Sequence, residues 1–362
     1  MKKLEKSVPV IRFKGFSEAW EQRKFIEIIN RLSKTSNSSI LPKVEYEDII
    51  AEEGRLNKDI SNKFDSRKGI LFQPKNILYG KLRPYLKNWL YPDFKGVAVG
   101  DFWVFEAIEA TPRFIYNLIQ SDSYQKVAND TAGTKMPRSD WTKVSNSSFF
   151  IPKESSEQKR IGTFFKQLDD TIALHQRKLD TLKQMKKGLL QQMFPKSEED
   201  VPKIRFADFD EEWYQRKLGE EFEKINERND GSFGKTHWIS VAKMYFVEPN
   251  KVLSNNIDTR TYVMRKGDIA FEGHSNTDFK FGRFVANDIG PGIVSELFPV
   301  YRHKTNYDNN YWKNAIQLEH IMAPIYSKSI TSSGNSSNKL DSKHFLNQKI
   351  YIADFEEQEK IG

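Results

Sequence analysis

An internal repeat constrains the fold of this chain more than any other feature of its 362 residues. Residues 8–28 and 201–221 are identical at 12 of 21 positions, at a constant offset of 193. Two further pairs of matching segments, 133–140 with 334–341 and 157–162 with 357–362, close each copy. Repeat arrays have periods of about 20–50 residues. The sequence therefore predicts two versions of one module rather than a solenoid.

Between these shared borders the two modules look unrelated in sequence. This suggests a common structural framework that carries two different surfaces. Short β-type runs in each module are divided by Gly, Pro and Asn, and helical patches intervene at 112–128 and 309–327. The predicted strands include 69–72, 96–99, 101–105, 261–264, 268–271 and 292–294. We predict an α+β fold: two tandem mixed α/β modules joined by a long helix of the coiled-coil type.

The joining helix is predicted from residues 157–194, which contain no proline; Pro195 ends it. A 4-3-4-3 spacing runs along Ile161, Phe165, Leu168, Ile172, His175, Leu179, Leu182, Lys186, Leu189 and Met193. Eight of these ten positions are apolar, a seam of about five heptads. At about 1.5 Å per residue the helix is roughly 55 Å long. Such a stripe needs a partner helix, and on it His175 is interpreted as a packed or register-setting position, not a catalytic one.

Charge and composition point to a polyanionic partner. The net charge is +8, with 26 Lys/Arg against 19 Asp/Glu in residues 1–155 and a near-neutral second half. The absence of cysteine excludes a disulfide framework, Cys-ligated zinc and a thiol nucleophile. The first 13 residues lack the apolar core of a signal peptide, and no stretch approaches the ~18 apolar residues of a membrane span. We expect a soluble cytoplasmic protein.

Residues 66–92 form the strongest local signal, because they hold six cations and five aromatic residues without a carboxylate. Cations attract phosphates and contact base edges, and aromatic rings can pack on sugars or on the thymine methyl. The alternative is a solvated basic face above core aromatics. With two cations near the end of this module, the predicted DNA-binding residues are Lys75, Lys81, Arg83, Tyr85, Lys87, Lys135 and Arg138.

In the second module the comparable stretch, 271–283, is polar and mixed in charge. A glutamate can accept a hydrogen bond from cytosine N4, and an asparagine can pair with adenine. An exposed polar loop without a DNA-binding role is an equally good interpretation. The candidates in this module are Glu272, His274, Ser275, Asn276, Lys280, Arg283, Asn338 and Lys339.

Motifs of catalysis are weak or missing. Residues 231–236 resemble a phosphate loop, but only two residues separate the glycines, where the Walker pattern needs four. The sequence has no Asn-Pro-Pro-Tyr tetrad of amino-methyltransferases, and residues 92–106 lack the carboxylate-x-Lys of a common nuclease site. The six histidines show no metal-ligand spacing. We therefore predict no catalytic residue, no cofactor-binding residue and no metal site.

Several motifs closely resemble those of the specificity subunits of type I restriction-modification systems. They are the two Pro-x-Ile-Arg-Phe…Trp-x-Gln-Arg-Lys segments, Leu-Tyr-Gly-Lys-Leu-Arg-Pro-Tyr-Leu at 78–86 and Gly-Thr-Lys-Met-Pro-Arg at 133–138. To these we add Gly-Asp-Ile-Ala-Phe-Glu-Gly-His at 267–274, Leu-His-Gln-Arg-Lys-Leu at 174–179 and the two Glu-Gln-x-x-Ile-Gly closures. The resemblance covers essentially the whole chain.

The resemblance implies a non-catalytic subunit that reads a bipartite DNA target and serves in phage defence. Residues 1–155 and 198–356 would be target-recognition domains, 156–197 a spacer and docking helix, and 357–362 the start of a second conserved helix. The helices would dock modification subunits, which bind S-adenosylmethionine, and restriction subunits with ATP and Mg would join them. Docking is expected along Phe165, Leu168, Ile172, His175, Leu179, Leu182, Leu189 and Met193.

The sequence departs from the family pattern at Gly362, where the second conserved helix should begin. We expect the central helix to pair in trans, with a second copy or with a modification subunit. An alternative function is a scaffold that binds, or competes for, modification subunits without reading DNA. A stand-alone nuclease or methyltransferase is disfavoured by the missing motifs.

Overall fold

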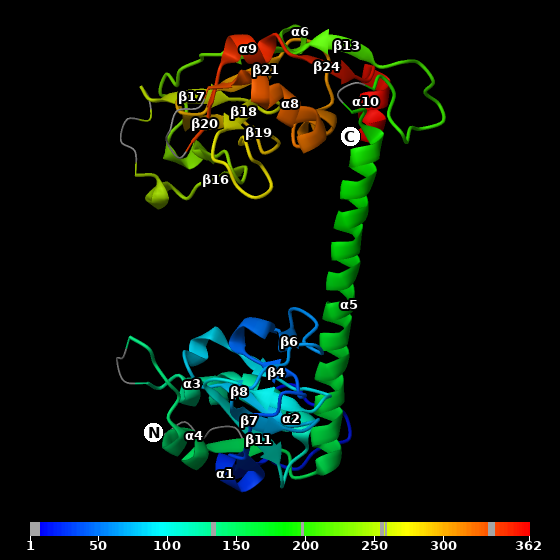
Figure 1. Cartoon of the computed structure of the whole chain (residues 1–362). Helices are drawn as coiled ribbons and strands as arrows, with labels where there is room; N and C mark the ends of the chain where they lie inside the picture. The colour runs from blue at the N-terminus through cyan, green and yellow to red at the C-terminus, as the bar shows by residue number, and fades with distance from the viewer. Residues whose placement is uncertain (1–7, 132–134, 197–198, 254–256, 258, 332–336) are drawn as a thin grey trace. The chain divides into compact units, whose positions relative to one another are not determined.

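The computed structural model describes residues 8–131, 135–196, 199–253, 257, 259–331 and 337–362. It divides into two compact units, Met1–Lys178 and Leu179–Gly362, and the division falls within the long helix α5 (Ser155–Met193) (Figure 1). Each unit mixes helices and strands, so the predicted α+β class with a long central helix is confirmed.

The first unit is built on two four-stranded sheets. One has the order β2 (Ile29–Leu32), β11 (Phe102–Ala107), β8 (Ile77–Gly80), β9 (Trp89–Leu90), and every pair in it is antiparallel. The other has the order β3 (Thr35–Ser36), β7 (Gly69–Phe72), β10 (Gly96–Ala98), β4 (Lys43–Val44). The remaining elements are β1 (Glu21–Lys24), α1 (Phe25–Ile28), η1 (Tyr46–Asp48), β5 (Ile49–Ile50), β6 (Arg55–Leu56), η2 (Pro84–Leu86), α2 (Pro112–Gln120), α3 (Asp122–Ala128), α4 (Trp141–Asn146) and β12 (Ser148–Ile151).

Alternation along the central strands places the first sheet between two apolar layers. Tyr79 and Phe105 face the cluster that contains residues of α2 and α3, whereas Leu78 and Val104 face the cluster that contains Phe72 of the second sheet. Successive side chains of a strand point to opposite faces, so a strand that is apolar throughout must be covered on both sides. The run 102–105 is buried at all four positions. The core therefore has a helix layer on one face and a strand layer on the other.

The second unit repeats this plan. Its main sheet has the order β14 (Phe222–Ile225), β21 (Val300–His303), β18 (Ile269–Glu272), β19 (Arg283–Ala286), and β17 (Thr261–Met264) pairs with β20 (Gly292–Ser295). The remaining elements are β13 (Tyr214–Lys217), α6 (Leu218–Glu221), η3 (Lys235–His237), β15 (Ile239–Ser240), β16 (Tyr245–Phe246), η4 (Pro249–Lys251), α7 (Asn309–Ala315), α8 (Glu319–Ser329), β22 (Ile330–Thr331), β23 (Lys339–Leu340), α9 (Ser342–Leu346), β24 (Lys349–Ile352) and α10 (Phe355–Ile361). The predicted helical patches are each two helices, because Ser121 caps α3 and a turn separates α7 from α8.

The repeated borders of the sequence form the same contact in both units. Arg12 donates two hydrogen bonds of 2.7 Å to the carboxylate of Glu157, which also accepts the indole N–H of Trp20 at 3.3 Å. In the second unit Arg205 makes two bonds of 2.8 Å to Glu357, which accepts the Trp213 indole at 2.9 Å. We call this arrangement the Arg–Glu–Trp latch. It ties the segment that enters each unit to the helix that closes it, which explains why these residues recur.

Helix α5 begins and ends within two residues of the predicted span. Phe165, Leu168, Ile172, Leu179, Leu182 and Leu189 are 42–63% exposed. His175 is exposed as well, whereas Met193 packs against the core of the second unit. The predicted seam is thus an open apolar stripe from Phe165 to Leu189, whereas Ile161 and Met193 pack against the cores of the first and second units.

Candidate DNA interface

In the first unit two segments that are distant in sequence lie side by side: the loop after β8 and the segment before α4. The backbone N–H of Arg83 donates to Pro137 O at 2.7 Å, and that of Ser139 donates to Lys81 O at 2.9 Å. An isolated antiparallel bridge joins Leu82 to Arg138. The cations predicted near 81–87 and near 135–138 therefore belong to one surface.

The backbone has an unusual conformation at three candidate cations, of which Arg83 and Lys87 follow β8 and Lys75 precedes it. Lys75, Arg83 and Lys87 have φ angles of 71°, 50° and 55°. A non-glycine residue in the left-handed region is uncommon, and such strain clusters at functional sites. Hydrogen bonds hold two of these turns, from Lys75 N to Pro92 O at 2.9 Å and from Lys87 N to Pro84 O at 2.9 Å. The loops thus present their cations from fixed positions.

Some of the predicted cations have acidic partners and others do not. Asp101 lies 3.1 Å from Arg138 and 3.6 Å from Lys81, and the Arg138 hydrogen bond holds the pKa of Asp101 below its usual range. Lys87 pairs with Glu52 at 3.2 Å. Lys75, Arg83 and Lys135 are exposed, and none of them forms an ion pair with another described residue. These three are the cations most available for phosphate.

The aromatic residues of the basic stretch 66–92 divide into buried and exposed ones. Phe72, Tyr79 and Trp89 are core residues with at most 4% exposure, whereas Tyr85 is 54% exposed. For these three residues the alternative interpretation, core aromatics beneath a basic face, is therefore correct. Tyr85 is exposed, so its contact with DNA stays a prediction. Sequence reasoning missed Tyr46: its hydroxyl donates to Asp101 O at 2.5 Å and accepts from Leu82 N at 3.2 Å. Burial raises the pKa of Tyr46.

In the second unit the equivalent two segments also meet. Asn338 N donates to Gly273 O at 2.9 Å, and a Cβ atom at Gly273 would lie 2.2 Å from Asn338 O. Only glycine allows this approach of two backbones. The candidates Asn338 and Lys339 therefore lie beside the loop that follows β18. Asn335 and Ser336, which share that predicted loop, lie outside the described residues.

Internal contacts engage several candidates of the second unit. The side-chain oxygen of Asn276 accepts the backbone N–H groups of residues 278 and 279, so this amide closes its own turn. Arg283 donates to Ala242 O at 2.6 Å and stacks on Phe279 at 4.8 Å. Glu272 is only 5% exposed. The exposed polar candidates are His274, Ser275, Asn276, Lys280 and Lys339.

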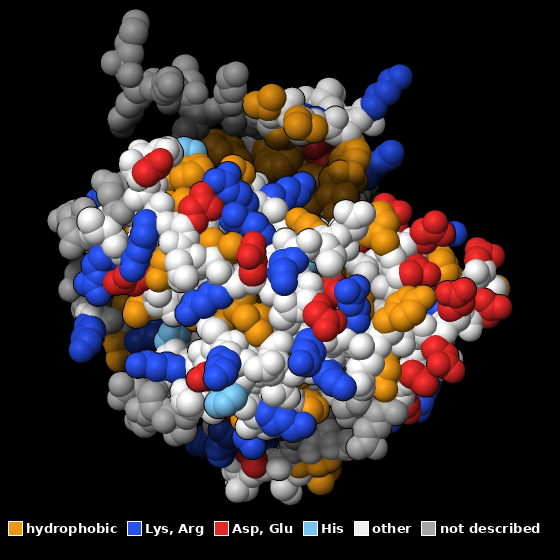
Figure 2. Space-filling model, turned by 90° about the horizontal axis from the view of Figure 1, so that it is seen from above, with side chains coloured by type: hydrophobic (Ala, Val, Ile, Leu, Met, Phe, Trp, Pro, Cys, Tyr) orange, Lys and Arg blue, Asp and Glu red, His pale blue; other side chains and the backbone are white. Residues whose placement is uncertain are grey.

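The charges of the second unit are dispersed. Seen from the side of α9 and β13, Lys and Arg side chains lie among polar and acidic ones, and acidic side chains gather on the side of α10 (Figure 2). This agrees with the near-neutral composition of residues 201–362. Contact of any of these candidates with DNA stays a prediction.

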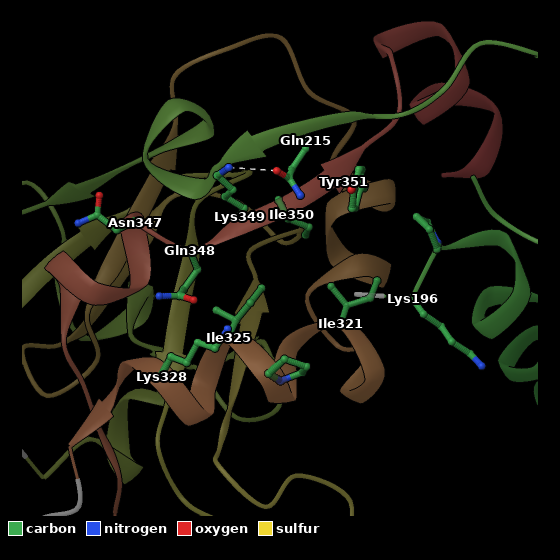
Figure 3. A pocket seen from close by; sticks show the side chains of 12 residues that line it. Lys196, Gln215, Ile321, Ile325, Lys328, Asn347, Gln348, Lys349, Ile350 and Tyr351 are labelled. Atoms are coloured by element: carbon green, nitrogen blue, oxygen red, sulfur yellow. Dashed lines mark hydrogen bonds between the residues drawn. The ribbon is translucent and has the colours of Figure 1, made fainter. Parts of the chain in front are cut away.

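The cavities of the described residues do not suggest catalysis. One, with a volume of about 340 Å³, is lined by Ile321 and Ile325 of α8, Gln215 of β13 and residues 349–351 of β24 (Figure 3). Lys349 of β24 donates to Gln215 of the neighbouring strand β13 at 3.1 Å (Figure 3). No group of three or more His, Cys, Asp or Glu side chains that could hold a metal ion occurs in the described parts of the chain. In those parts, no helix is long and apolar enough to cross a membrane.

Two versions of one module, each with two adjoining loop segments, and a helix with an open apolar stripe are the features that the sequence predicts for a DNA-specificity subunit. Residues 17–184 match the family described as "Type I restriction modification DNA specificity domain". The matched segment supports the predicted resemblance to specificity subunits, which are the non-catalytic DNA-recognition components of type I systems. The missing second conserved helix stays a prediction.

Solved structures resemble the chain over 98% of its length. One is described as "Structural basis underlying complex assembly and conformational transition of the type I R-M system", with 17% identity, a TM-score of 0.55 and 90% of that chain covered. The type I restriction-modification S subunit from M. genitalium has 12% identity, a TM-score of 0.51 and 90% coverage. The HsdS subunit from Thermoanaerobacter tengcongensis has 19% identity, a TM-score of 0.45 and 88% coverage. The first two show a shared fold. No curated protein matches the sequence.

Proposed function

We propose that this chain reads a bipartite duplex target, one half with each unit, and directs methylation and cleavage by partner subunits. The observation that carries the proposal is the repeated juxtaposition of two loop segments, after β8 and before α4 in one unit, after β18 and before α9 in the other. The framework is the same in both units and the exposed side chains differ. A module that reads two different half-sites needs such a shared framework with different exposed side chains.

The first unit suits a readout based on charge. Arg83 and Lys135 are exposed cations on one surface, and Tyr85 projects beside them. Arginine can contact guanine O6 and N7 with two hydrogen bonds, and lysine can neutralise phosphates. The second unit offers hydrogen-bonding groups in a neutral setting, so it would contribute more to base discrimination than to salt-dependent affinity.

The open stripe of α5 is proposed as the docking surface for modification subunits or for a second copy of the chain. Its exposed residues from Phe165 to Leu189 are apolar and large, and burying one such side chain contributes about 1.5–3 kcal/mol. S-adenosylmethionine, ATP and Mg would be bound by the partner subunits. Restriction subunits would join the same complex.

One observation favours a scaffold as the second candidate function. The α5 stripe shares no residue with the two loop surfaces, so a chain that did not read DNA would still bind a partner helix. Binding to random duplex DNA distinguishes the two candidates, because a scaffold has no need of it.

The decisive experiment combines the chain with modification subunits and maps methylated positions in a DNA library. One bipartite motif is the expected result. Replacing residues 1–155 by the corresponding segment of another specificity subunit should then change one half of the motif. A change in both halves, or methylation without a motif, would contradict the modular reading of DNA.

A further inference from the structure

We propose that Glu272 is a positioning residue that orients the imidazole of His274, and that His274 is the group with which the second unit contacts a base edge. The ligand would be the exocyclic amino group of an adenine or a cytosine in the major groove. This inference deepens the proposed function and rests on it. It also changes the role that the sequence suggests for Glu272, which was direct acceptance of a hydrogen bond from a base.

Burial separates Glu272 from any ligand. It is the last residue of β18, within the main sheet, and its side chain is 7% exposed. Its Oε1 atom accepts the backbone N–H of His274 at 3.0 Å and lies 2.5 Å from Nδ1 of the same residue. A base edge would have to displace both contacts to reach Oε1. The glutamate therefore acts through the histidine.

Close backbone packing fixes the turn that carries the histidine. A Cβ atom at Gly282, whose φ is +81°, would lie 2.4 Å from Glu272 O, and one at Gly273 would lie 2.2 Å from Asn338 O. These approaches hold residues 272 and 273 between the start of β19 and the segment before β23. The backbone of His274 is therefore held on two sides, and its ring is held by the carboxylate.

The His274 side chain is 63% exposed and stands at the point that corresponds to the basic loop of the first unit. Val104 pairs with Leu78 in the first unit, and Val300 pairs with Ala270 in the second. Leu78 and Ala270 are therefore equivalent positions of the two units. His274, four residues after Ala270, is then equivalent to Leu82, and its neighbour Ser275 is equivalent to Arg83. Asn276 Oδ1 and the Arg283 guanidinium are engaged in internal contacts, whereas the exposed His274 imidazole is held by its contact with Glu272.

The hydrogen-bonding chemistry follows from the contact with the carboxylate. An ionised carboxylate only accepts hydrogen bonds, so Nδ1 of the ring must carry the proton that it shares with Glu272. In the neutral ring Nε2 is then an acceptor. Adenine N6 and cytosine N4 are the donors that the major groove presents, and a good base contact discriminates by about 10-fold or more.

The test selects targets from a randomised duplex library at pH 8, with the full chain and its modification subunits. For the wild type we expect one motif, and for His274→Ala a motif that relaxes at one A or C position of the second half-site with about 10-fold weaker discrimination. Glu272→Gln keeps an acceptor oxygen and should stay within about 2-fold of wild type, whereas Glu272→Ala should relax the same position as His274→Ala. His344→Ala is the matched control, since that exposed histidine also lies beside a carboxylate, Asp341, at 3.6 Å.

Two results would overturn the inference while leaving the proposed function intact: an unchanged motif for His274→Ala, or a Glu272→Ala effect that persists when His274 is already alanine. If the wild type selects no motif, the proposed function itself fails. Nitrogen NMR of histidine-labelled chain supplies a readout that does not depend on DNA. We expect an unprotonated Nε2 at His274 that Glu272→Ala converts to a mixture of tautomers; a protonated Nε2 in the wild type refutes the assigned contact.

Discussion

The Arg–Glu–Trp latch gives the sharpest test of how each unit is closed, and we develop it for Glu357→Ala. Both carboxylate oxygens of Glu357 accept from Arg205 at 2.8 Å, and one also accepts the Trp213 indole N–H at 2.9 Å. The side chains of Arg205 and Glu357 are 11% and 1% exposed. Removing the glutamate therefore leaves a nearly buried guanidinium and a buried indole donor without an acceptor.

The cost of this substitution can be estimated from similar cases. Breaking a buried ion pair by removing one partner costs about 3–5 kcal/mol, because the remaining charge stays desolvated. For a unit of 150–250 residues, 1 kcal/mol lowers the melting temperature by about 2–4 °C. We expect Glu357→Ala to lower the melting temperature of the second unit by about 6–20 °C.

Differential scanning calorimetry of the full chain measures this shift. Glu356→Ala is the matched control, because the neighbouring glutamate is exposed and its removal changes the net charge equally. An apolar replacement of the pair, Arg205→Met with Glu357→Leu, should recover part of the loss, since no charge is then left buried. If Glu357→Ala melts within about 2 °C of Glu356→Ala, the latch does not stabilise the unit and the reasoning fails.

Three further predictions concern charge, DNA and the helix. Burial lowers the pKa of His303 to about 3, so between pH ~6.5 and pH 3 the unfolded state binds a proton that the folded state does not. The folded state therefore loses about 2 kcal/mol of stability from this group between pH 7 and pH 5, and His303→Phe should abolish that loss in urea unfolding. Arg83→Ala should reduce the slope of log Kd against log salt by about 1, whereas Arg67→Ala should not, because Arg67 pairs with Glu45 and Asp65; equal slopes would contradict this. Leu182→Ala should weaken binding of a modification subunit about 10-fold or more in calorimetric titration, and Gln184→Ala, about 200° around the helix, should not.

Much of the fold can be predicted from local sequence, because its signals are local. The strands 69–72 and 261–264 occur with the predicted bounds, and α5 lies within two residues of its predicted span. Short β-type runs divided by Gly, Pro and Asn predict the strands, and the 4-3-4-3 apolar spacing without proline predicts the helix. The break at Ser121 was missed, because its side chain caps a new helix inside a stretch whose apolar spacing continues.

The candidate site could be predicted only in part, because the state of each side chain depends on residues far along the chain. Arg67 looks like its basic neighbours in sequence, but Glu45, 22 residues away, pairs with it at 2.6 Å. Arg283 is engaged by Ala242 O, 41 residues away. Composition identified the candidate loops, and only the tertiary contacts separate available cations from those that already have partners.

The candidate DNA-contacting residues are distinct from the residues that stabilise each unit, so one framework can carry two different surfaces. The latch and the aromatic clusters are buried, whereas Arg83, Tyr85, Lys135 and His274 are exposed. Substituting an exposed loop residue usually changes stability by less than about 0.5 kcal/mol, and losing a buried charge partner costs several times more. The exposed loops can therefore vary while the borders stay the same. Buried supports such as Glu272 are the places where a change in recognition should also cost stability, and its two variants test this directly: Glu272→Ala should lower the melting temperature more than His274→Ala does.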